Sequence, residues 1–423
     1  MAARSSSALR LATRAHPRCH SSTSALRTFK VERYVGWTDG SDSLSSSETE
    51  ALSLEELLAH ADAEGTERWK SLSLGYPSHN EGSPFLRQEI LRQYDSSLMQ
   101  DISQVNVCAP QEGIYLASRA LLAPGDHVVA TTPLYQSLGE VARSMGCEVS
   151  AWRPDGLDGN ADGLDGNADS RPRFDPSALE DLIRPGRTRL VVANWPHNPT
   201  GAVPTAQEYE RVVRACAAAG CHLLVDEMYR HLEHAPAAAL PAACEAYELG
   251  VSLAGLSKTV GLPGLRVGWL ASRDAALMAR VATLKDYTTI CPAAPSEVLA
   301  LVALRASGPL LARSRGIIAT GLAATREMVH SVPEHVEWAE PSAGTFAFVR
   351  LRGVRPGEST EAYCDALRRR ANLMLMPGAL FELDDTPEAG DAAQRVRVTY
   401  GRRVTVPLLG RWADDLRRCG VAT

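Results

Sequence analysis

Three short apolar runs, each followed at once by a polar motif, constrain the fold of this chain most strongly. Their composition predicts buried strands at Leu190–Ala193, Cys221–Val225 and Gly250–Ala254. Between the first two, Gln207–Ala219 has a helical pattern that Gly220 closes. Strand, helix and strand in succession predict an α/β fold. The polar motifs would then share one edge of the sheet, where open α/β sheets bind ligands.

Lysine is rare here, which makes one lysine informative. The chain has four lysines and forty arginines, and Lys258 lies in the Gly- and Leu-rich stretch 254–269. A guanidinium stays protonated, whereas a buried lysine amine can lose its proton and condense with an aldehyde. Arg266 places a fixed cation eight residues further on. An imine-forming amine beside such a cation suggests a cofactor with an aldehyde and a phosphate, as in pyridoxal 5'-phosphate.

The motifs that begin at Asn194, Asp226 and Ala254, in this order and each after a strand, resemble those of class I/II aminotransferases of the fold-type-I pyridoxal-phosphate enzymes. The similarity runs from about Tyr34 to the C-terminus. It implies a large α/β domain at about residues 85–305 with a mostly parallel sheet. A smaller α+β domain would combine the N-terminal arm, 31–84, with residues 306–423. The implied activity moves an amino group from an L-amino acid to a 2-oxo acid, in a homodimer with shared sites.

The resemblance assigns roles around the cofactor ring. Lys258 would hold the cofactor as a Schiff base and then move a proton between Cα and C4′. Asp226 matches the acid that pairs with the pyridinium nitrogen and keeps the ring an electron sink. Tyr229 and Asn198 match the donors to the ring's 3′-oxygen, and Tyr135 matches the aromatic residue that stacks on the ring. The alternatives are core packing for the tyrosines and a helix cap for Asp226.

The cofactor's phosphate needs backbone N–H groups, often at a helix start, and a cation. The stretch Val107–Ile114 is the candidate loop. Two residues depart from the family pattern, because Pro110 has no N–H to give and Gly255 replaces the usual serine or threonine three residues before the lysine. The phosphate residues that the resemblance implies are Ala109, Pro110, Gln111, Arg266 and, from the other subunit, Tyr76.

The substrate's α-carboxylate is expected to bind an arginine near the C-terminus. The pattern of Arg395–Arg402 predicts a strand, and Arg397 matches the family's arginine that grips the carboxylate through a bidentate pair. Alternation places Arg395 on the same face, so it is a competing candidate. Asn198 is a second candidate for substrate binding. The segment Pro341–Phe346 resembles the loop that closes over substrate.

Two other functions remain open from the sequence. Residues 194–202, 261–269 and 286–289 resemble segments of capreomycidine synthase, a pyridoxal-phosphate enzyme that eliminates and cyclises. A guanidino-bearing substrate would need an acid in the pocket, and the sequence does not place one. Thr288–Pro292 contains no arginine, which argues against a specialist for dicarboxylates. A regulator on the same fold would lack Lys258 or add a winged helix, and neither holds.

The first thirty residues have the composition of an organelle transit peptide. They contain six basic residues, many serines and no acid. We expect residues 1–30 to direct the protein to the mitochondrion, with the plastid as the alternative. The mature protein is then expected to begin within about ten residues of Thr28. Losing six positive charges would take the net charge from −6 to −12, which argues against nucleic-acid binding.

Other patterns exclude several kinds of site. No apolar run approaches the roughly eighteen residues that a membrane span needs. The nine cysteines form no Cys-Xaa-Xaa-Cys pair and are typical of reduced thiols. Asp155–Ala161 is repeated directly at Asp162–Ala168, without the final bidentate glutamate of a calcium loop. We interpret the repeat as a solvated loop and expect no metal.

Overall fold

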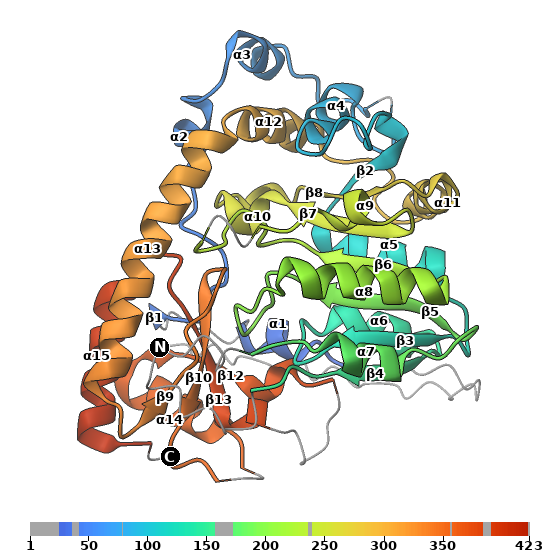
Figure 1. Cartoon of the computed structure of the whole chain (residues 1–423). Helices are drawn as coiled ribbons and strands as arrows, with labels where there is room; N and C mark the ends of the chain where they lie inside the picture. Colours follow the sequence, from blue (N-terminus) through green and yellow to red (C-terminus); the bar gives the residue numbers. More distant parts are fainter. Residues whose placement is uncertain are drawn as a thin grey trace, which may run out of the picture.

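A seven-stranded sheet forms the centre of the molecule, in the order β2-β8-β7-β6-β5-β3-β4 (Figure 1). The computed structural model describes residues 25–35, 42–77, 79–156, 172–235, 239–355, 358–383 and 391–421. The strands of this sheet are β2 (Val105–Cys108), β3 (His127–Thr131), β4 (Glu148–Trp152), β5 (Thr188–Asn194), β6 (His222–Asp226), β7 (Gly250–Gly255) and β8 (Gly268–Ser272). Strand β8 is antiparallel to both neighbours and the other pairs are parallel, which confirms the mostly parallel sheet.

Successive side chains of each strand pack against two different layers of helices, because they point to opposite faces of the sheet. Leu190 and Val192 of β5 belong to one core cluster, and Val191 and Ala193 belong to another. The first face is covered by α5 (Pro110–Leu121), α6 (Ser137–Ser144) and α11 (Ala275–Lys285), and the second by α7 (Pro176–Leu182) and α8 (Ala206–Ala219). The sheet is therefore buried on both faces, as parallel sheets generally are.

Helix α8 shows how the local sequence sets an element. Thr205 and Glu208 form a capping box, in which each side chain accepts the other residue's backbone N–H. Gly220 ends the helix at a φ of 64°, a left-handed conformation that glycine adopts freely. The predicted helix and its glycine stop are confirmed.

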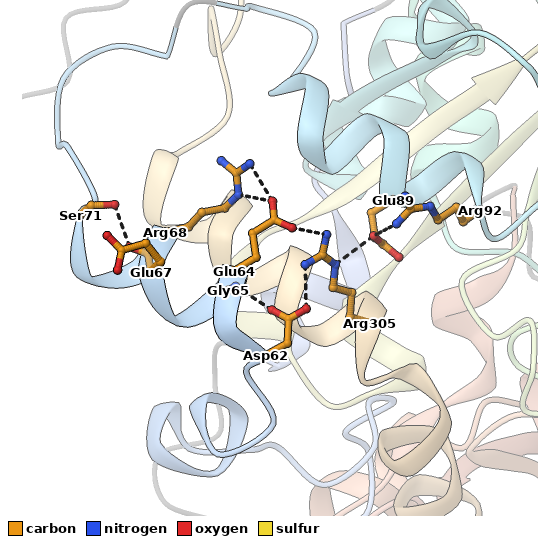
Figure 2. Close-up of polar contacts among 9 residues, drawn as sticks. All are labelled: Asp62, Glu64, Gly65, Glu67, Arg68, Ser71, Glu89, Arg92 and Arg305. Carbon is orange, nitrogen blue, oxygen red and sulfur yellow. Dashed lines mark hydrogen bonds and ion pairs between the residues drawn. The ribbon is translucent and has the colours of Figure 1, made fainter.

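Ion pairs around Arg305 fix the N-terminal helices to the body of the molecule (Figure 2). The guanidinium lies 2.8 Å from Asp62, 2.8 Å from Glu64 and 3.1 Å from Glu89. The helices of this layer are α2 (Leu54–Leu58), α3 (Ala63–Lys70), α4 (Pro84–Leu91) and α12 (Ala294–Arg305). Because Asp62 also caps α3, one cation orders both the start of that helix and its docking on α12.

A smaller α+β layer combines both ends of the chain. Its antiparallel sheet has the order β12-β13-β10-β9, and a second, parallel sheet pairs β1 with β11. Its elements are β1 (Asp42–Ser43), β9 (Val336–Glu337), β10 (Phe346–Leu351), β11 (Leu373–Met374), β12 (Met376–Pro377), β13 (Arg395–Thr399), α13 (Ser307–Ser331), α14 (Glu361–Ala371) and α15 (Thr405–Cys419). Since β1 is N-terminal and β11 is C-terminal, the predicted combination of termini is confirmed. The domain boundaries near residues 85 and 305 stay a prediction.

One predicted strand is too long. Strand β13 ends at Thr399, not at residue 402. The N–H of Tyr400 donates to the Thr345 carbonyl at 2.7 Å, and the Gly401 carbonyl accepts the N–H of Glu50 at 2.8 Å. Both bonds join residues 400 and 401 to residues outside the strands, so the chain leaves the sheet after Thr399.

Two further findings concern the described ranges as a whole. No helix in them has the length and apolar character that crossing a membrane demands. The eight cysteines in them are free. Residues 1–24, with most of the expected transit peptide, and residues 157–171, with most of the repeat, lie outside the described residues.

Candidate active site

A cavity of about 390 Å³ lies at the carboxyl ends of the central strands. Nine of the predicted site residues line it, namely Pro110, Gln111, Tyr135, Asn198, Asp226, Tyr229, Lys258, Arg266 and Arg397. Ala109 and Tyr76 do not line it. The polar motifs after β5, β6 and β7 therefore meet in one place, as the order of strands in the sheet requires.

Lys258 lies in the short helix α10 (Leu256–Thr259), directly after β7. Its Nζ donates to Ser47 Oγ at 2.9 Å and lies 3.9 Å from Glu48 Oε2. The side chain is 26% exposed, and Lys258 lines the cavity. Burial lowers the pKa of the Lys258 amine, which favours the neutral form that a nucleophile needs.

The departure at Gly255 has a steric reason. A Cβ at this position would lie 3.0 Å from the Cα of Gly268 and 3.1 Å from the carbonyl of Val267. A Cβ at Gly268 would meet the Ala254 carbonyl at 2.5 Å and the Pro110 ring at 2.8 Å. A serine or threonine at residue 255 would therefore require the neighbouring backbone to shift by a few tenths of an ångström, which glycine avoids.

Asp226 is the buried acid at the end of β6. Its Oδ1 accepts the N–H of Met228 at 3.1 Å, and burial raises the pKa of the carboxyl group to about 6. The Asn194 amide joins this strand end to the next, because its Nδ2 donates to the Asp226 carbonyl at 2.8 Å and its Oδ1 accepts the Asn198 N–H at 2.7 Å. Sequence reasoning did not assign a role to Asn194, which orders two predicted site residues.

Two tyrosines form part of the cavity wall. The hydroxyl of Tyr135 donates to Glu32 Oε1 at 2.8 Å, and its ring lies 5.1 Å from that of Phe29. The ring of Tyr229 packs edge-on to Phe346 at 4.8 Å. Burial raises the pKa of both phenols, so both stay protonated donors at neutral pH. The predicted stacking and donor roles are compatible with these positions and stay predictions.

The expected phosphate loop is a helix start. Strand β2 ends at Cys108 and α5 begins at Pro110, so Ala109 alone separates them. Proline at the first helical position removes an N–H that would have no partner within the helix, and the next N–H groups of the first turn remain available to an anion. Arg266, exposed and with a φ of 55°, lines the same cavity. The buried Oγ of Ser257 has no hydrogen-bond partner among the described residues.

The structure separates the two candidate arginines of β13. Arg397 lines the cavity and donates to Asn198 Oδ1 at 2.9 Å and to the Ser45 carbonyl at 2.6 Å. Its Nε is buried and has no partner among the described residues. Arg395 does not line the cavity and donates to the Phe348 carbonyl at 3.2 Å. Arg397 is therefore the arginine in position to bind a carboxylate in this cavity.

Sequence reasoning missed one wall of the cavity. Val31 and Glu32 of α1 (Lys30–Val35) and the segment Ser45–Glu48 line it. The segment follows β1, so the rule that found the other motifs, polar residues after a strand, applies to it as well. A two-residue strand is too short to stand out in the sequence. The sequence alone placed no acid in the substrate pocket, and the structure places Glu32 and Glu48 in the cavity wall.

Two predicted segments lie elsewhere. Tyr76 is 88% exposed. The segment Pro341–Phe346 packs against the loop after β5, where the Gly201 carbonyl accepts the N–H groups of Ser342 and Ala343. None of its residues lines the cavity. Closure of this segment over a substrate stays a prediction.

The cavity suits pyridoxal phosphate. Its volume of about 390 Å³ falls within the range of small-molecule sites. Lys258 offers an amine, Asp226 an acid, and the α5 N-terminus with the unpartnered Ser257 hydroxyl offers donors for a phosphate. Across the described residues, no three His, Cys, Asp or Glu side chains gather as a metal site would need.

Comparisons with known proteins agree with this geometry. The family model described as "Aminotransferase class I and II" matches residues 68–407. Capreomycidine synthase of Streptomyces vinaceus is 31% identical over 323 residues, which cover 73% of this chain and 74% of that protein. The solved structure of a PLP-dependent aminotransferase from Streptococcus suis has a TM-score of 0.80 and 27% identity, covering 93% of this chain and 98% of that one. The PLP-dependent cyclase OrfR has a TM-score of 0.77 and 26% identity, covering 95% and 99%. The chain therefore belongs to the class I and II aminotransferases, fold-type-I enzymes that use pyridoxal phosphate.

Proposed function

We propose that this protein moves an amino group from an L-amino acid to a 2-oxo acid, with Lys258 as the residue that holds the cofactor. The observation that carries this proposal is the meeting of the Lys258 amine, the buried Asp226 carboxyl and the Arg397 guanidinium in one cavity. When bound, pyridoxal phosphate supplies an aldehyde that captures amines and a ring that draws electrons away from Cα. The residues supply binding, orientation and proton transfer.

Lys258 is suited to two tasks. Burial lowers the pKa of its amine, so a neutral form is available to hold the cofactor and, once displaced, to take a proton from Cα and return it at C4′. Ser47 accepts a hydrogen bond from Nζ and limits its orientation. Asp226 lies at the end of β6, and a cation opposite its buried carboxyl would lower the raised pKa. It would therefore pair as a carboxylate with a protonated ring nitrogen.

Arg397 is prepared to bind the α-carboxylate. Asn198 and the Ser45 carbonyl hold two of its nitrogens, and its buried Nε has no partner among the described residues. A carboxylate in the cavity would satisfy the remaining donors and offset the cost of a buried charge. This fixes Cα relative to Lys258, which is what selective removal of its proton requires.

The reaction is tested by half-reactions. An amino acid added without any oxo acid should convert the cofactor to its amine form, seen as loss of the imine absorption band, and a 2-oxo acid should restore the band. No conversion by any of the proteinogenic amino acids would overturn the proposal.

The second candidate is elimination and cyclisation. It is favoured by the 31% identity to capreomycidine synthase. Such an enzyme would return the cofactor to its aldehyde form in every turnover and would need a leaving group on its substrate. Turnover of a β- or γ-substituted amino acid without oxo acid, together with no amine form from plain amino acids, would support this candidate instead.

We also propose that two copies of the chain form a homodimer with shared sites. Tyr76 and Leu74 are 88% and 83% exposed, and Tyr76 does not line the cavity of its own chain. A partner would bury these side chains and bring Tyr76 to the partner's cofactor phosphate. Tyr76→Ala and Lys258→Ala proteins, each of low activity, should regain activity when mixed after partial unfolding, because one site per mixed dimer is then intact. No regain would contradict shared sites.

The mitochondrial address remains a proposal, with the plastid as its alternative. It is supported by the basic, serine-rich and acid-free composition of residues 1–30. The relatives from Streptomyces vinaceus and Streptococcus suis described above are bacterial enzymes and do not bear on it. Fluorescence microscopy of the full chain fused to a C-terminal fluorescent protein should show the organelle, and a diffuse signal would contradict the proposal.

A further inference from the structure

Two acids of the cavity are not used by the chemistry proposed above. The charged residues that line the cavity are Lys258, Arg266, Arg397, Asp226, Glu32 and Glu48. The cofactor's aldehyde, phosphate and ring nitrogen match Lys258, Arg266 and Asp226, and the α-carboxylate of any amino acid matches Arg397. The substrate's α-amino group would react at the cofactor's aldehyde, so no other positively charged group common to all amino acid substrates remains to pair with Glu32 and Glu48.

Both acids come from the N-terminal part of the chain. Glu48 lies five residues after β1 ends, with its Oε2 at 3.9 Å from Lys258 Nζ. Glu32 belongs to α1, and its Oε1 accepts the hydrogen bond from Tyr135. The other Glu32 oxygen and the Glu48 carboxylate can therefore accept further hydrogen bonds from a ligand in the cavity.

Both carboxylates line the same cavity as Lys258 and Arg397, and Glu48 Oε2 lies 3.9 Å from Lys258 Nζ. The negative charges of Glu32 and Glu48 each act to raise the pKa of both Lys258 and Arg397, the two residues between which the substrate's Cα would lie. A side chain extending from Cα toward the N-terminal wall would thus meet two negative charges.

We propose that Glu32 and Glu48 select amino acid substrates whose side chains carry a positive charge, an amine or a guanidine. This inference rests on the proposed function and names its substrate class. A cation between the two carboxylates would be paired in a partly desolvated site, where charge pairs are stronger than at the surface. An aspartate or glutamate side chain would instead face like charges, which disfavours binding.

The test compares substrates that differ in one charge. L-Ornithine and L-norvaline have the same number of side-chain carbons, and only ornithine carries a terminal amine. We expect the holoenzyme to convert ornithine with a kcat/KM at least about tenfold above that for norvaline, and L-glutamate to be the poorest of the three. If norvaline or glutamate is converted best, the selection is overturned while transamination stands. If none of the three reacts but an amino acid with an uncharged or acidic side chain does, the selection also fails.

Variants assign the effect to the two acids. Glu32→Gln and Glu48→Gln should each lower the ornithine-to-norvaline ratio of kcat/KM by about tenfold. Each should also weaken binding of α-methyl-L-ornithine, measured by calorimetry, because this compound lacks the Cα proton and cannot complete transamination at Cα. Glu210→Gln is the matched control, since the Glu210 side chain is 66% exposed on α8. An equal loss for both substrates would show that the residue positions Lys258, and an unchanged ratio would show that it has no role; either outcome overturns the inference for that residue.

Discussion

The guanidinium of Arg397 donates to Asn198 Oδ1 at 2.9 Å, although the two residues lie 199 positions apart in the chain. Arg397 is on β13 of the smaller layer, and Asn198 follows β5 of the central sheet. The bond therefore joins the two layers at the point where the substrate would bind. A substrate carboxylate that binds Arg397 would be held by both layers at once.

Replacing Arg397 should weaken substrate binding far more than replacing its neighbour in β13. We expect Arg397→Ala to raise the KM for amino acids by an amount equivalent to about 2–4 kcal/mol, because it removes one side of a buried charged pair. Arg395→Ala is the matched comparison, since Arg395 has the same residue type on the same strand and does not line the cavity. Steady-state kinetics of both variants measure the difference. A larger KM for Arg395→Ala would mean that the assignment is wrong by two residues.

Loss of Lys258 should abolish covalent attachment of the cofactor. The purified protein should be yellow, with an imine absorption band that borohydride removes, and Lys258→Ala should take up the cofactor without that band. The rate should fall at least about 10³-fold, because a covalent catalyst is lost. Lys70→Ala, at an exposed position of α3, is the control and should keep both band and rate. A colourless wild-type protein that takes up no cofactor would contradict this prediction.

Asp226 should make the stability of the cofactor-free protein depend on pH. Burial raises the pKa of its carboxyl group from 3.8 to about 6, so in this range the folded protein holds a proton that the unfolded chain has released. The free energy of unfolding should therefore fall as pH rises through this range, by a total on the order of 3 kcal/mol. Asp226→Asn keeps an acceptor for the Met228 N–H and removes the charge, so it should lack this slope and be the more stable protein at pH 7.

Urea unfolding at several pH values between 4 and 7 measures this difference. The holoenzyme should show the opposite order, because the cofactor's ring nitrogen pairs with the carboxylate and Asp226→Asn should bind the cofactor more weakly. Parallel pH profiles for the two cofactor-free proteins would show that Asp226 does not hold its proton in the folded state.

Local patterns predicted the elements of the central sheet well. The apolar runs that precede Asn194, Asp226 and Lys258 are strands, and Gly220 ends α8 as its freedom at positive φ allows. These predictions succeeded because each depends on residues close together in the chain. The site predictions that follow a strand end, such as Lys258 and Asp226, succeeded for the same reason.

Long-range placement could not be predicted from the same patterns. Glu32 and Glu48 reach the cavity only because β1 pairs with β11, more than three hundred residues away, and because α1 packs beside Tyr135. Arg395 and Arg397 are two residues apart, so the strand pattern places both on the same face of the sheet. Only the packing of β13 between β10 and β12 determines which of them reaches Asn198.

Ser257 should contribute to cofactor binding and little to folding. Its Oγ is buried at the cavity without a partner among the described residues, so a bound phosphate would give it one. Ser257→Ala should weaken cofactor affinity about tenfold, since a hydrogen bond to a charged group is worth about 1.5–3 kcal/mol. Ser314 of α13 has a similarly buried, unpartnered Oγ away from the cavity, so Ser314→Ala should leave the affinity unchanged. Equal affinities for wild type and Ser257→Ala in cofactor titrations would exclude contact with the phosphate.

The N-terminal segment should be dispensable up to about residue 25 and required beyond it. The Arg27 N–H donates to Glu140 at 2.6 Å and the Lys30 N–H to Gln136 at 2.9 Å, and these bonds hold α1 beside the cavity. A chain that begins at Ala25 should therefore keep the full kcat/KM, whereas one that begins at Asp42 should lose at least about tenfold, because it lacks the wall that Glu32 provides.

The hydrogen bonds of Arg27 and Lys30 favour a transit peptide shorter than the expected residues 1–30, with a mature protein that begins before Arg27 and keeps both basic residues. N-terminal sequencing of the protein from its native source measures this directly. A mature chain that starts after Glu32, or an Asp42 truncation with unchanged kinetics, would show that α1 takes no part in the active site.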